Sequence, residues 1–120
     1  MKLFGFVASV ALVVVGLSGS GAAQGAAVTG TLMDIACSSH HATEAGYTES
    51  HDKKCLLMDA CIKSGYSLVT ADKKVLKFDA KGNDLALALI KKTDHDKDWK
   101  VSVDGKVTGD TIAVSAIKMQ

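Results

Sequence analysis

Six residues of the types that bind transition metals lie within one stretch of the chain, CSSHHATEAGYTESHDKKCLLMDAC (37–61). The stretch holds all three cysteines of the protein and three of its four histidines. The spacing of Cys37 and His40 lets both side chains reach one ion. His51 and Cys55 have a second spacing of this kind, and thiolate and imidazole ligands suit zinc or copper. The stretch therefore predicts a copper or zinc site whose ligands come from Cys37, His40, His41, His51 and Cys55.

The same cysteines also suit a disulfide bond. In an exported protein two of three cysteines usually oxidise, and a bond from Cys37 to Cys55 or Cys61 would close a loop of about twenty residues that contributes roughly 3 to 3.5 kcal/mol. We favour Cys61 as the partner of Cys37, because it lies on the apolar face of a predicted helix beside Leu57. A Cys37–Cys61 disulfide would still leave Cys55, His51 and one loop histidine as a three-ligand site.

A thiol redox centre is the third interpretation of this stretch. Cys55 follows two lysines at the predicted start of a helix, where the helix dipole lowers the pKa of a thiol. Against this interpretation, the chain has no C-x-x-C motif and no thioredoxin-like alternation of strands and helices. It also has no nucleophile elbow or phosphate loop, so the sequence favours a binding protein over an enzyme.

The first 23 residues have the three parts of a secretory signal peptide. Met1 and Lys2 give a positive start, residues 3–17 are apolar, and Gly21 and Ala23 occupy the small-residue positions of a peptidase site. The apolar run is too short and too soon followed by small polar residues for a membrane span. We therefore expect cleavage after Ala23, a mature chain in the periplasm or outside the cell, and no integral membrane span in that chain.

The composition argues against nucleic acid as a partner. Loss of Lys2 with the signal peptide takes the formal charge from +1 to zero, and the chain contains no arginine. Arginine is the residue best suited to bidentate recognition of phosphate and guanine, and a neutral surface gains little from releasing counterions. The partner is therefore expected to be a protein or a small ligand.

The remaining patterns predict a β-rich domain with two short helices. Asp52 should cap the first helix and Gly65 should end it, while Asn83 or Asp84 should cap the second. Turn signals at Asp104-Gly105 and Gly109-Asp110 divide the last segment into two or three strands. In chain order we expect a strand at 27–37, a loop at 38–54, a helix at 53–65, a hairpin at 66–80, a helix at 85–93 and strands within 99–119.

This order of elements suits a small five-stranded OB-like Greek-key barrel. The tally is about five short strands, one helix in the first half and one between the third and fourth strands. Closure into a barrel removes the exposed edges that so few strands would otherwise leave. Residues 24–120 would then be a single mainly β domain with the Cys/His segment 37–61 inserted in it, and a helix-flanked antiparallel sheet is the alternative.

Several segments resemble those of small exported bacterial proteins of unknown function. They are GTLMDIAC (30–37), a histidine-containing loop, two further cysteines, SGYSLV (64–69) and VSVDGKVTGDTIAVSAI (101–117). The second half is also similar to the bacterial OB-fold family of periplasmic proteins, in which a Y-x-L strand and a final V-x-G-x-V pair recur. These resemblances imply a barrel and export but no reaction, and the insert 37–61 is not part of the second family's usual pattern.

Overall fold

Five strands and five helices form the part of the chain that the computed structural model describes, residues 27–120. The signal peptide expected at residues 1–23 lies outside these described residues. The predicted number of strands is confirmed. The helices cover about as many residues as the strands, so the helical part is larger than the one or two helices predicted, and the domain is not mainly β.

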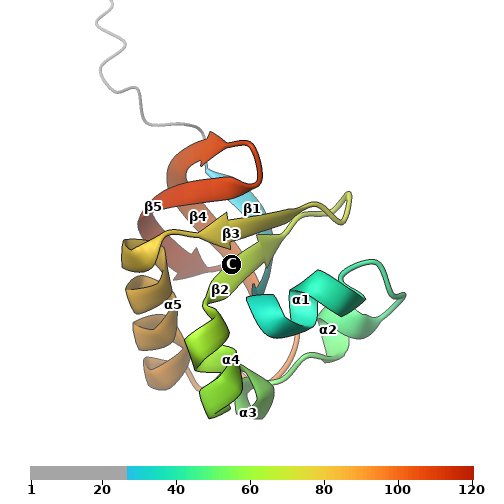
Figure 1. Cartoon of the computed structure of the whole chain (residues 1–120). Coiled ribbons are helices and arrows are strands. Elements are labelled where there is room, and N and C mark those ends of the chain that lie inside the picture. The colour runs from blue at the N-terminus through green and yellow to red at the C-terminus, as the bar shows by residue number, and fades with distance from the viewer. Residues whose placement is uncertain (1–26) are drawn as a thin grey trace, which may run out of the picture.

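The strands form one mixed sheet. β1 pairs antiparallel with both β2 and β4, β2–β3 and β4–β5 are antiparallel neighbours, and a short parallel pairing joins β3 to β5. The hydrogen-bonded order β1-β2-β3-β5-β4 therefore returns to β1 and closes a ring (Figure 1). The bounds are β1 (Val28–Asp34), β2 (Tyr66–Val69), β3 (Val75–Phe78), β4 (Lys100–Thr108) and β5 (Thr111–Met119).

Gly30 lies where β1 changes its pairing partner. Gly30 itself pairs with Val101 of β4, and the next residue, Thr31, pairs with Val69 of β2 as well as with β4. A Cβ atom at position 30 would lie only 2.5 Å from the carbonyl oxygen of Val69. The close approach of the two strands therefore requires glycine at this position.

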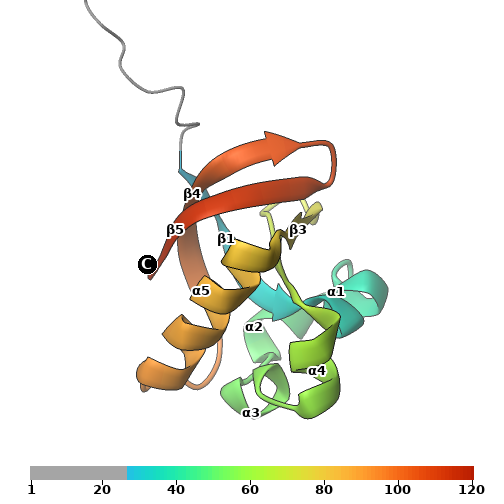
Figure 2. The same cartoon turned by 60° about the vertical axis from the view of Figure 1, so that its left-hand side comes forward.

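Four of the helices in residues 27–120 lie between β1 and β2 in the chain, and the fifth, α5 (Ala80–Lys92), lies between β3 and β4. Figures 1 and 2 show α1 to α4 gathered at one end of the sheet, whereas α5 lies along the sheet and packs against β5. None of the helices in residues 27–120 has the length and apolar character needed to cross a membrane. The first four are α1 (Ile35–His41), α2 (Tyr47–Ser50), α3 (Lys53–Leu56) and α4 (Asp59–Ser64).

The segment 38–54, predicted to be a loop, is partly helical. It contains the end of α1 and the whole of α2. The helix α1 begins because the side chain of Asp34 accepts a hydrogen bond from the backbone N–H of Cys37 at 2.9 Å. Ser38 anchors the helix to the sheet through a 2.8 Å hydrogen bond with Ser67 of β2. The sequence of α1 has no apolar repeat that would predict a helix, because the helix is stabilised by a polar cap and by the buried Ser38–Ser67 pair.

The helix predicted at 53–65 is divided into α3 and α4. Met58 has an extended backbone, with ψ at 139°, and α4 starts directly after it. The predicted ends are confirmed: Asp52 caps α3 by accepting a 2.8 Å hydrogen bond from the N–H of Cys55, and Gly65 ends α4 with φ at 83°. The break changes the relative directions of Cys55 and Cys61 from those of a continuous helix.

The second predicted helix starts earlier than expected. Asp79, rather than Asn83 or Asp84, caps α5 by accepting a 2.9 Å hydrogen bond from the N–H of Gly82. The same carboxylate oxygen accepts a 3.2 Å hydrogen bond from the N–H of Val114, which ties the helix to β5. Asn83 has another role, because its side-chain oxygen accepts a hydrogen bond from the N–H at the start of β2.

The last segment forms two strands joined at Gly109-Asp110. Gly109 has φ at 62° in this turn, so the turn signal is confirmed. Asp104-Gly105 is not a turn: the pairing of β4 with β5 shifts register there, which marks a β-bulge.

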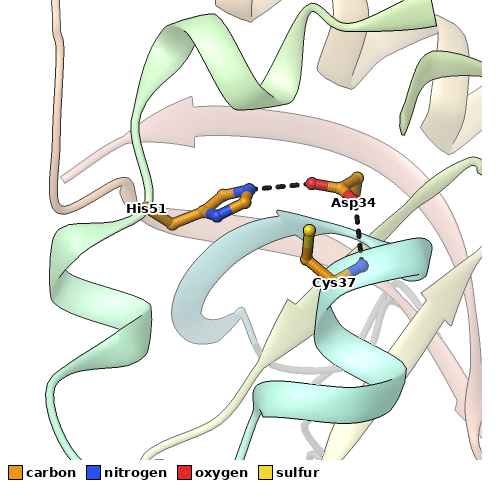
Figure 3. Close-up of side chains that lie close together, drawn as sticks. All are labelled: Asp34, Cys37 and His51. Carbon is orange, nitrogen blue, oxygen red and sulfur yellow. Dashed lines mark hydrogen bonds and ion pairs between the residues drawn. The ribbon is translucent and has the colours of Figure 1, made fainter. Parts of the chain in front are cut away.

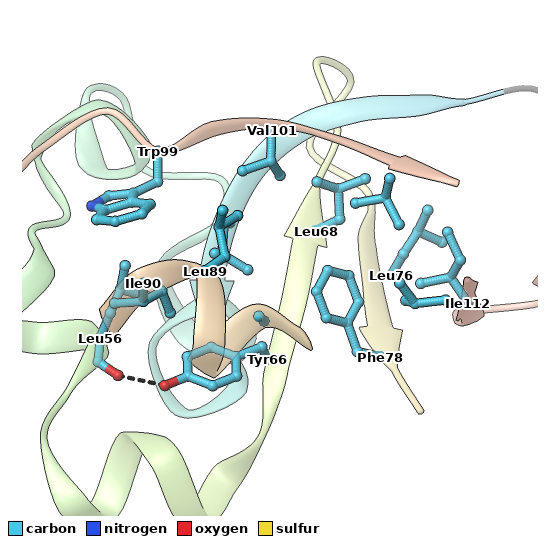
Figure 4. Packing of buried hydrophobic residues seen from close by; sticks show 14 residues of the cluster. Leu56, Tyr66, Leu68, Leu76, Phe78, Leu89, Ile90, Trp99, Val101 and Ile112 are labelled. Atoms are coloured by element: carbon cyan, nitrogen blue, oxygen red, sulfur yellow. Dashed lines mark hydrogen bonds between the residues drawn. The ribbon is translucent and has the colours of Figure 1, made fainter. Parts of the chain in front are cut away.

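The apolar core fills the sheet ring and continues beneath α3 and α5 (Figure 4). Three aromatic residues, Tyr66, Phe78 and Trp99, are buried in it. The hydroxyl of Tyr66 donates a 2.7 Å hydrogen bond to the carbonyl oxygen of Leu56, and this bond attaches α3 to β2. The core thereby fixes the end of the sheet at which β1 leads into α1.

Candidate metal centre

Three side chains meet where β1 ends. Asp34, Cys37 and His51 each offer one ligand atom, and these atoms all lie within 4.8 Å of one another (Figure 3). Asp34 is the last residue of β1, Cys37 lies in the first turn of α1, and His51 follows α2 directly. Residues up to 17 positions apart in the chain are therefore brought to one point.

Asp34 is the centre of this group. It is fully buried, and its two carboxylate oxygens have different partners. Oδ2 accepts the hydrogen bond from the N–H of Cys37, and Oδ1 lies 2.8 Å from Nε2 of His51. Burial raises the pKa of Asp34, but the hydrogen bonds from His51 and Cys37 outweigh this effect and hold its pKa below the ordinary value. The group thus contains a buried, ionised oxygen ligand.

His51 is held in place from both sides. It is only 4% exposed, its backbone N–H donates to the carbonyl of Tyr47 at 3.1 Å, and the Tyr47 ring lies against its imidazole. The next residues are tied to the loop before β4, since the N–H of Lys53 donates a 2.7 Å hydrogen bond to the carbonyl of Asp96. The imidazole is therefore oriented towards Asp34 before any ligand binds.

The pKa values of the thiols near the group are raised. Burial raises the pKa of Cys37, and the charge of Asp34 adds to the effect, while a hydrogen bond from Tyr47 opposes it. Burial also raises the pKa of Cys61, to about 12, with the charge of Asp34 as the next cause. A hydrogen bond with Asp52 raises the pKa of Cys55. The expected lowering of this pKa by the helix start and its lysines is therefore wrong.

All three cysteines are free in this structure, so the predicted Cys37–Cys61 disulfide is not present. The two residues are nevertheless neighbours. The start of α1 is joined to the end of α4 by a 2.8 Å hydrogen bond from the N–H of Ile35 to the carbonyl of Gly65. The Cys37 and Cys61 side chains are also close enough for each to affect the pKa of the other.

The other expected ligands lie apart from the group of three. His40 is exposed on α1, and His41 pairs with Glu44 at 2.8 Å and stacks on the ring of Tyr47. Cys55 is half-buried and interacts with Asp52. Of the five residues predicted as metal ligands, the structure brings Cys37 and His51 together.

The cysteine and histidine pattern of residues 37–61 does not include Asp34, the third member of the group. The available signal was a single carboxylate in an otherwise apolar stretch, TLMDIAC (31–37), at a position that a strand would bury. A buried carboxylate needs a cation or strong hydrogen-bond donors. An acidic residue three positions before a cysteine should therefore be counted among the candidate ligands.

The donor set fits zinc chemistry. One carboxylate oxygen, one imidazole nitrogen and one thiolate sulfur are all ordinary zinc ligands. A tetrahedral ion with bonds of about 2.0–2.1 Å to nitrogen and oxygen separates those two atoms by about 3.3 Å. Nε2 of His51 and Oδ1 of Asp34 lie 2.8 Å apart, so a modest side-chain movement would admit the ion in place of the shared proton.

Comparisons with protein-family models, with curated proteins and with solved structures found no match for the chain. The resemblance to exported bacterial proteins and to the periplasmic OB-fold family therefore stays a prediction.

Proposed function

We propose that this protein is an exported binding protein for a transition metal, zinc or copper, held by Asp34, Cys37 and His51. One observation carries the proposal: three donors of suitable chemistry lie within 4.8 Å of one another, and two of them are buried. Burying a carboxylate is costly unless it is paired, and a divalent cation would pair it more strongly than an imidazole does.

The surroundings of the group support metal binding. The backbone N–H of Cys37 holds one oxygen of Asp34, and the other oxygen, which contacts His51, would face the ion. Tyr47 packs against His51 and opposes the rise in the pKa of the Cys37 thiol. Outer groups that orient ligands in this way typically change metal affinity by about 10–100-fold.

The test compares ligand and control variants. Zinc affinity is measured by competition with a chromophoric chelator in reducing buffer, on the wild type, Cys37→Ser, His51→Gln, His40→Ala and His41→Ala. We expect the first two variants to lose more than about 10-fold in affinity and the exposed His40→Ala variant to bind as the wild type does. His41→Ala removes a ring that stacks on Tyr47, so it should lose less affinity than either ligand variant. Equal losses in all four variants, or no loss in the first two, would contradict the proposal.

We propose further that the mature protein begins at Gln24 and acts in the periplasm or outside the cell. The support is the charged, apolar and small-residue order of residues 1–23. The intact mass of the protein recovered from the extracytoplasmic fraction tests this. A mass that includes residues 1–23, or a protein confined to the cytoplasm, would contradict it.

The OB type remains our proposal for the sheet ring. Its support is the strand order β1-β2-β3-β5-β4, the parallel β3–β5 pairing and the helix between β3 and β4. An experimental structure in which β1 pairs with only one of β2 and β4 would favour the alternative, a helix-flanked antiparallel sheet.

A disulfide-stapled interaction module is the second candidate function. The contact between the thiols of Cys37 and Cys61 favours it, because these two could join when the protein meets an oxidising compartment. Its signature is an intact mass two hydrogens below the reduced mass in protein isolated from its native compartment. A thiol oxidoreductase is less well supported, since the pKa values of all three thiols are raised and the reactive thiolate is disfavoured.

A further inference from the structure

We infer that Cys61 is a fourth ligand beside Asp34, Cys37 and His51, and that the four residues form a closed zinc site. This inference rests on the proposed metal binding and names the metal and the ligand set. It departs from the sequence-based expectation, in which Cys61 serves only as a disulfide partner.

The position of Cys61 is the first argument. It is the buried residue of α4 and is 7% exposed. Two hydrogen bonds tie the end of α4 to the start of α1: the N–H of Ile35 donates to the carbonyl of Gly65 at 2.8 Å, and the N–H of Ala36 donates to Oγ of Ser64 at 3.1 Å. Since Cys37 is the next residue of α1, these bonds hold it close to α4, the helix that carries Cys61.

The surroundings of the Cys61 thiol are the second argument. A buried cysteine usually packs as a small apolar residue. In the described part of the chain, Cys61 belongs to neither of the two apolar core clusters. After burial, the nearby Asp34 and Cys37 are the causes that raise the pKa of the Cys61 thiol. The thiol therefore lies near two of the proposed ligands.

The resulting donor set selects the metal. Two thiolates, one imidazole and one carboxylate make a four-coordinate set of a kind that zinc accepts. Cu(I) prefers soft sulfur ligands, and a carboxylate is a poor partner for it. Met58, whose thioether would suit Cu(I), is 53% exposed and turned to solvent. The observations therefore favour zinc over copper.

Four protein ligands also define the role of the ion. Catalytic zinc sites keep one position open for water or substrate, whereas sites with four protein ligands are structural. The ligands would join the end of β1, the first turn of α1, the residue after α2, and α4. Zinc would thus hold the four-helix insert against the sheet.

Cys55 provides a matched control. It lies in the same insert and is half-buried, but its thiol interacts with Asp52, and the backbone N–H of Cys55 donates to the same aspartate. Cys55→Ser and Cys61→Ser are therefore the same chemical change at two thiols with different partners.

The experiment uses Co²⁺ as a spectroscopic probe of the reduced protein. Thiolate-to-cobalt charge-transfer absorption reports how many thiolates bind, and the visible bands report tetrahedral geometry. In Cys61→Ser we expect the charge-transfer intensity to fall by about half, because one of two thiolates is lost, and zinc affinity to fall by more than about 10-fold. Cys55→Ser should retain the wild-type spectrum and affinity.

Different outcomes separate the inference from the proposal on which it rests. If Co²⁺ binding depends on Cys37 and His51 but Cys61→Ser keeps the full spectrum, the fourth ligand is wrong and the metal site stands. If the wild type binds no Co²⁺ or Zn²⁺, both are wrong.

A second measurement needs no variant and remains decisive if Cys61→Ser does not fold. The wild type is alkylated with and without zinc, and the modified cysteines are mapped by mass spectrometry. We expect zinc to protect Cys37 and Cys61 and to leave the modification of Cys55 unchanged. Protection of Cys37 alone would overturn the fourth ligand.

Discussion

Asp34 is a buried carboxylate that contacts two neighbouring segments at once. It caps α1 through the N–H of Cys37 and hydrogen-bonds to the imidazole of His51. In the proposed site the same side chain is also the oxygen ligand. Its structural role and its metal-binding role can be separated, because asparagine is an equally good N-cap residue but a much weaker ligand.

We predict that Asp34→Asn and Asp34→Ala both lower zinc affinity by more than about 10-fold, because both remove the charged oxygen. Only the alanine variant also loses the cap, so the metal-free Asp34→Ala protein should be less stable than Asp34→Asn by about 1 kcal/mol. Zinc titration and urea unfolding in a chelator measure the two effects. Wild-type zinc affinity in the asparagine variant would exclude the carboxylate as a ligand.

The sequence showed which types of residue could bind a metal, but it did not show which of them lie close together in the fold. Cys37 and His51 could be named from their types and spacing, whereas His40 and His41 looked equally suitable and face away on α1. The difference arises from α1, because the helix fixes which side chains of 37–41 face the sheet. Asp34 could be recognised as a candidate ligand only from the structure, in which it is buried beside Cys37 and His51.

The elements around the site are held by a few specific polar contacts. Tyr66 of β2 binds the carbonyl of Leu56 at the end of α3, and Asp79 joins α5 to β5. Such contacts explain why hairpins and amphipathic segments could be predicted while α1, α2 and the break between α3 and α4 could not. Capping aspartates and a buried Ser38–Ser67 pair leave no hydrophobic period in the sequence.

Tyr66→Phe should destabilise the domain by about 1–2 kcal/mol, since it removes a buried hydrogen bond. Burial raises the pKa of Tyr66 to about 12. The unfolded chain ionises this hydroxyl from its ordinary pKa of about 10, so the stabilisation is complete below that pH and is lost as the pH rises towards about 12.

Urea unfolding of both proteins between pH 8 and about 12 measures this effect, and the lysines common to both cancel in the difference. The stability advantage of the wild type over Tyr66→Phe should narrow above about pH 10. A constant difference across this range would mean that Tyr66 is not buried as described.

Gly82→Ala tests the packing of α5 on the sheet. In an exposed helix this change stabilises by about 0.5–1 kcal/mol. Here the new Cβ would lie 2.6 Å from Cγ2 of Val114 and 2.9 Å from Cβ of Phe78. We therefore predict destabilisation by about 1–3 kcal/mol, measured by thermal or urea unfolding.

The control for this prediction is Ala88→Gly on the exposed side of the same helix. It should cost about 1 kcal/mol from helix propensity alone. A stabilising Gly82→Ala would show that α5 does not approach β5 as closely as the structure indicates.

At the scale of the whole domain, residues 27–120 form a sheet ring with a helical insert at one end, and the proposed site lies where the two meet. The five strands and the two hairpins were predictable because apolar alternation marks the strands, and polar residues or a glycine mark the turns. The pairing of β3 with β5 and the convergence of residues 34, 37 and 51 depend on long-range contacts that no local pattern encodes.

Because zinc would join segments that are far apart in the chain, it should stabilise the whole fold. Zinc at 100 times its Kd would add about 2.7 kcal/mol to the free energy of unfolding. For a domain of this size that corresponds to a rise in Tm of roughly 10–20 °C. Differential scanning calorimetry with zinc and with a chelator measures the shift, and Cys37→Ser should show little of it.

The most direct test is anomalous X-ray diffraction at the zinc absorption edge, on crystals of the reduced protein grown with zinc. We predict a strong peak within about 2.0–2.3 Å of Oδ1 of Asp34, Sγ of Cys37 and Nε2 of His51. If zinc lies instead on the exposed histidines of α1, with Asp34 and His51 still hydrogen-bonded to each other, these three residues are not a metal site.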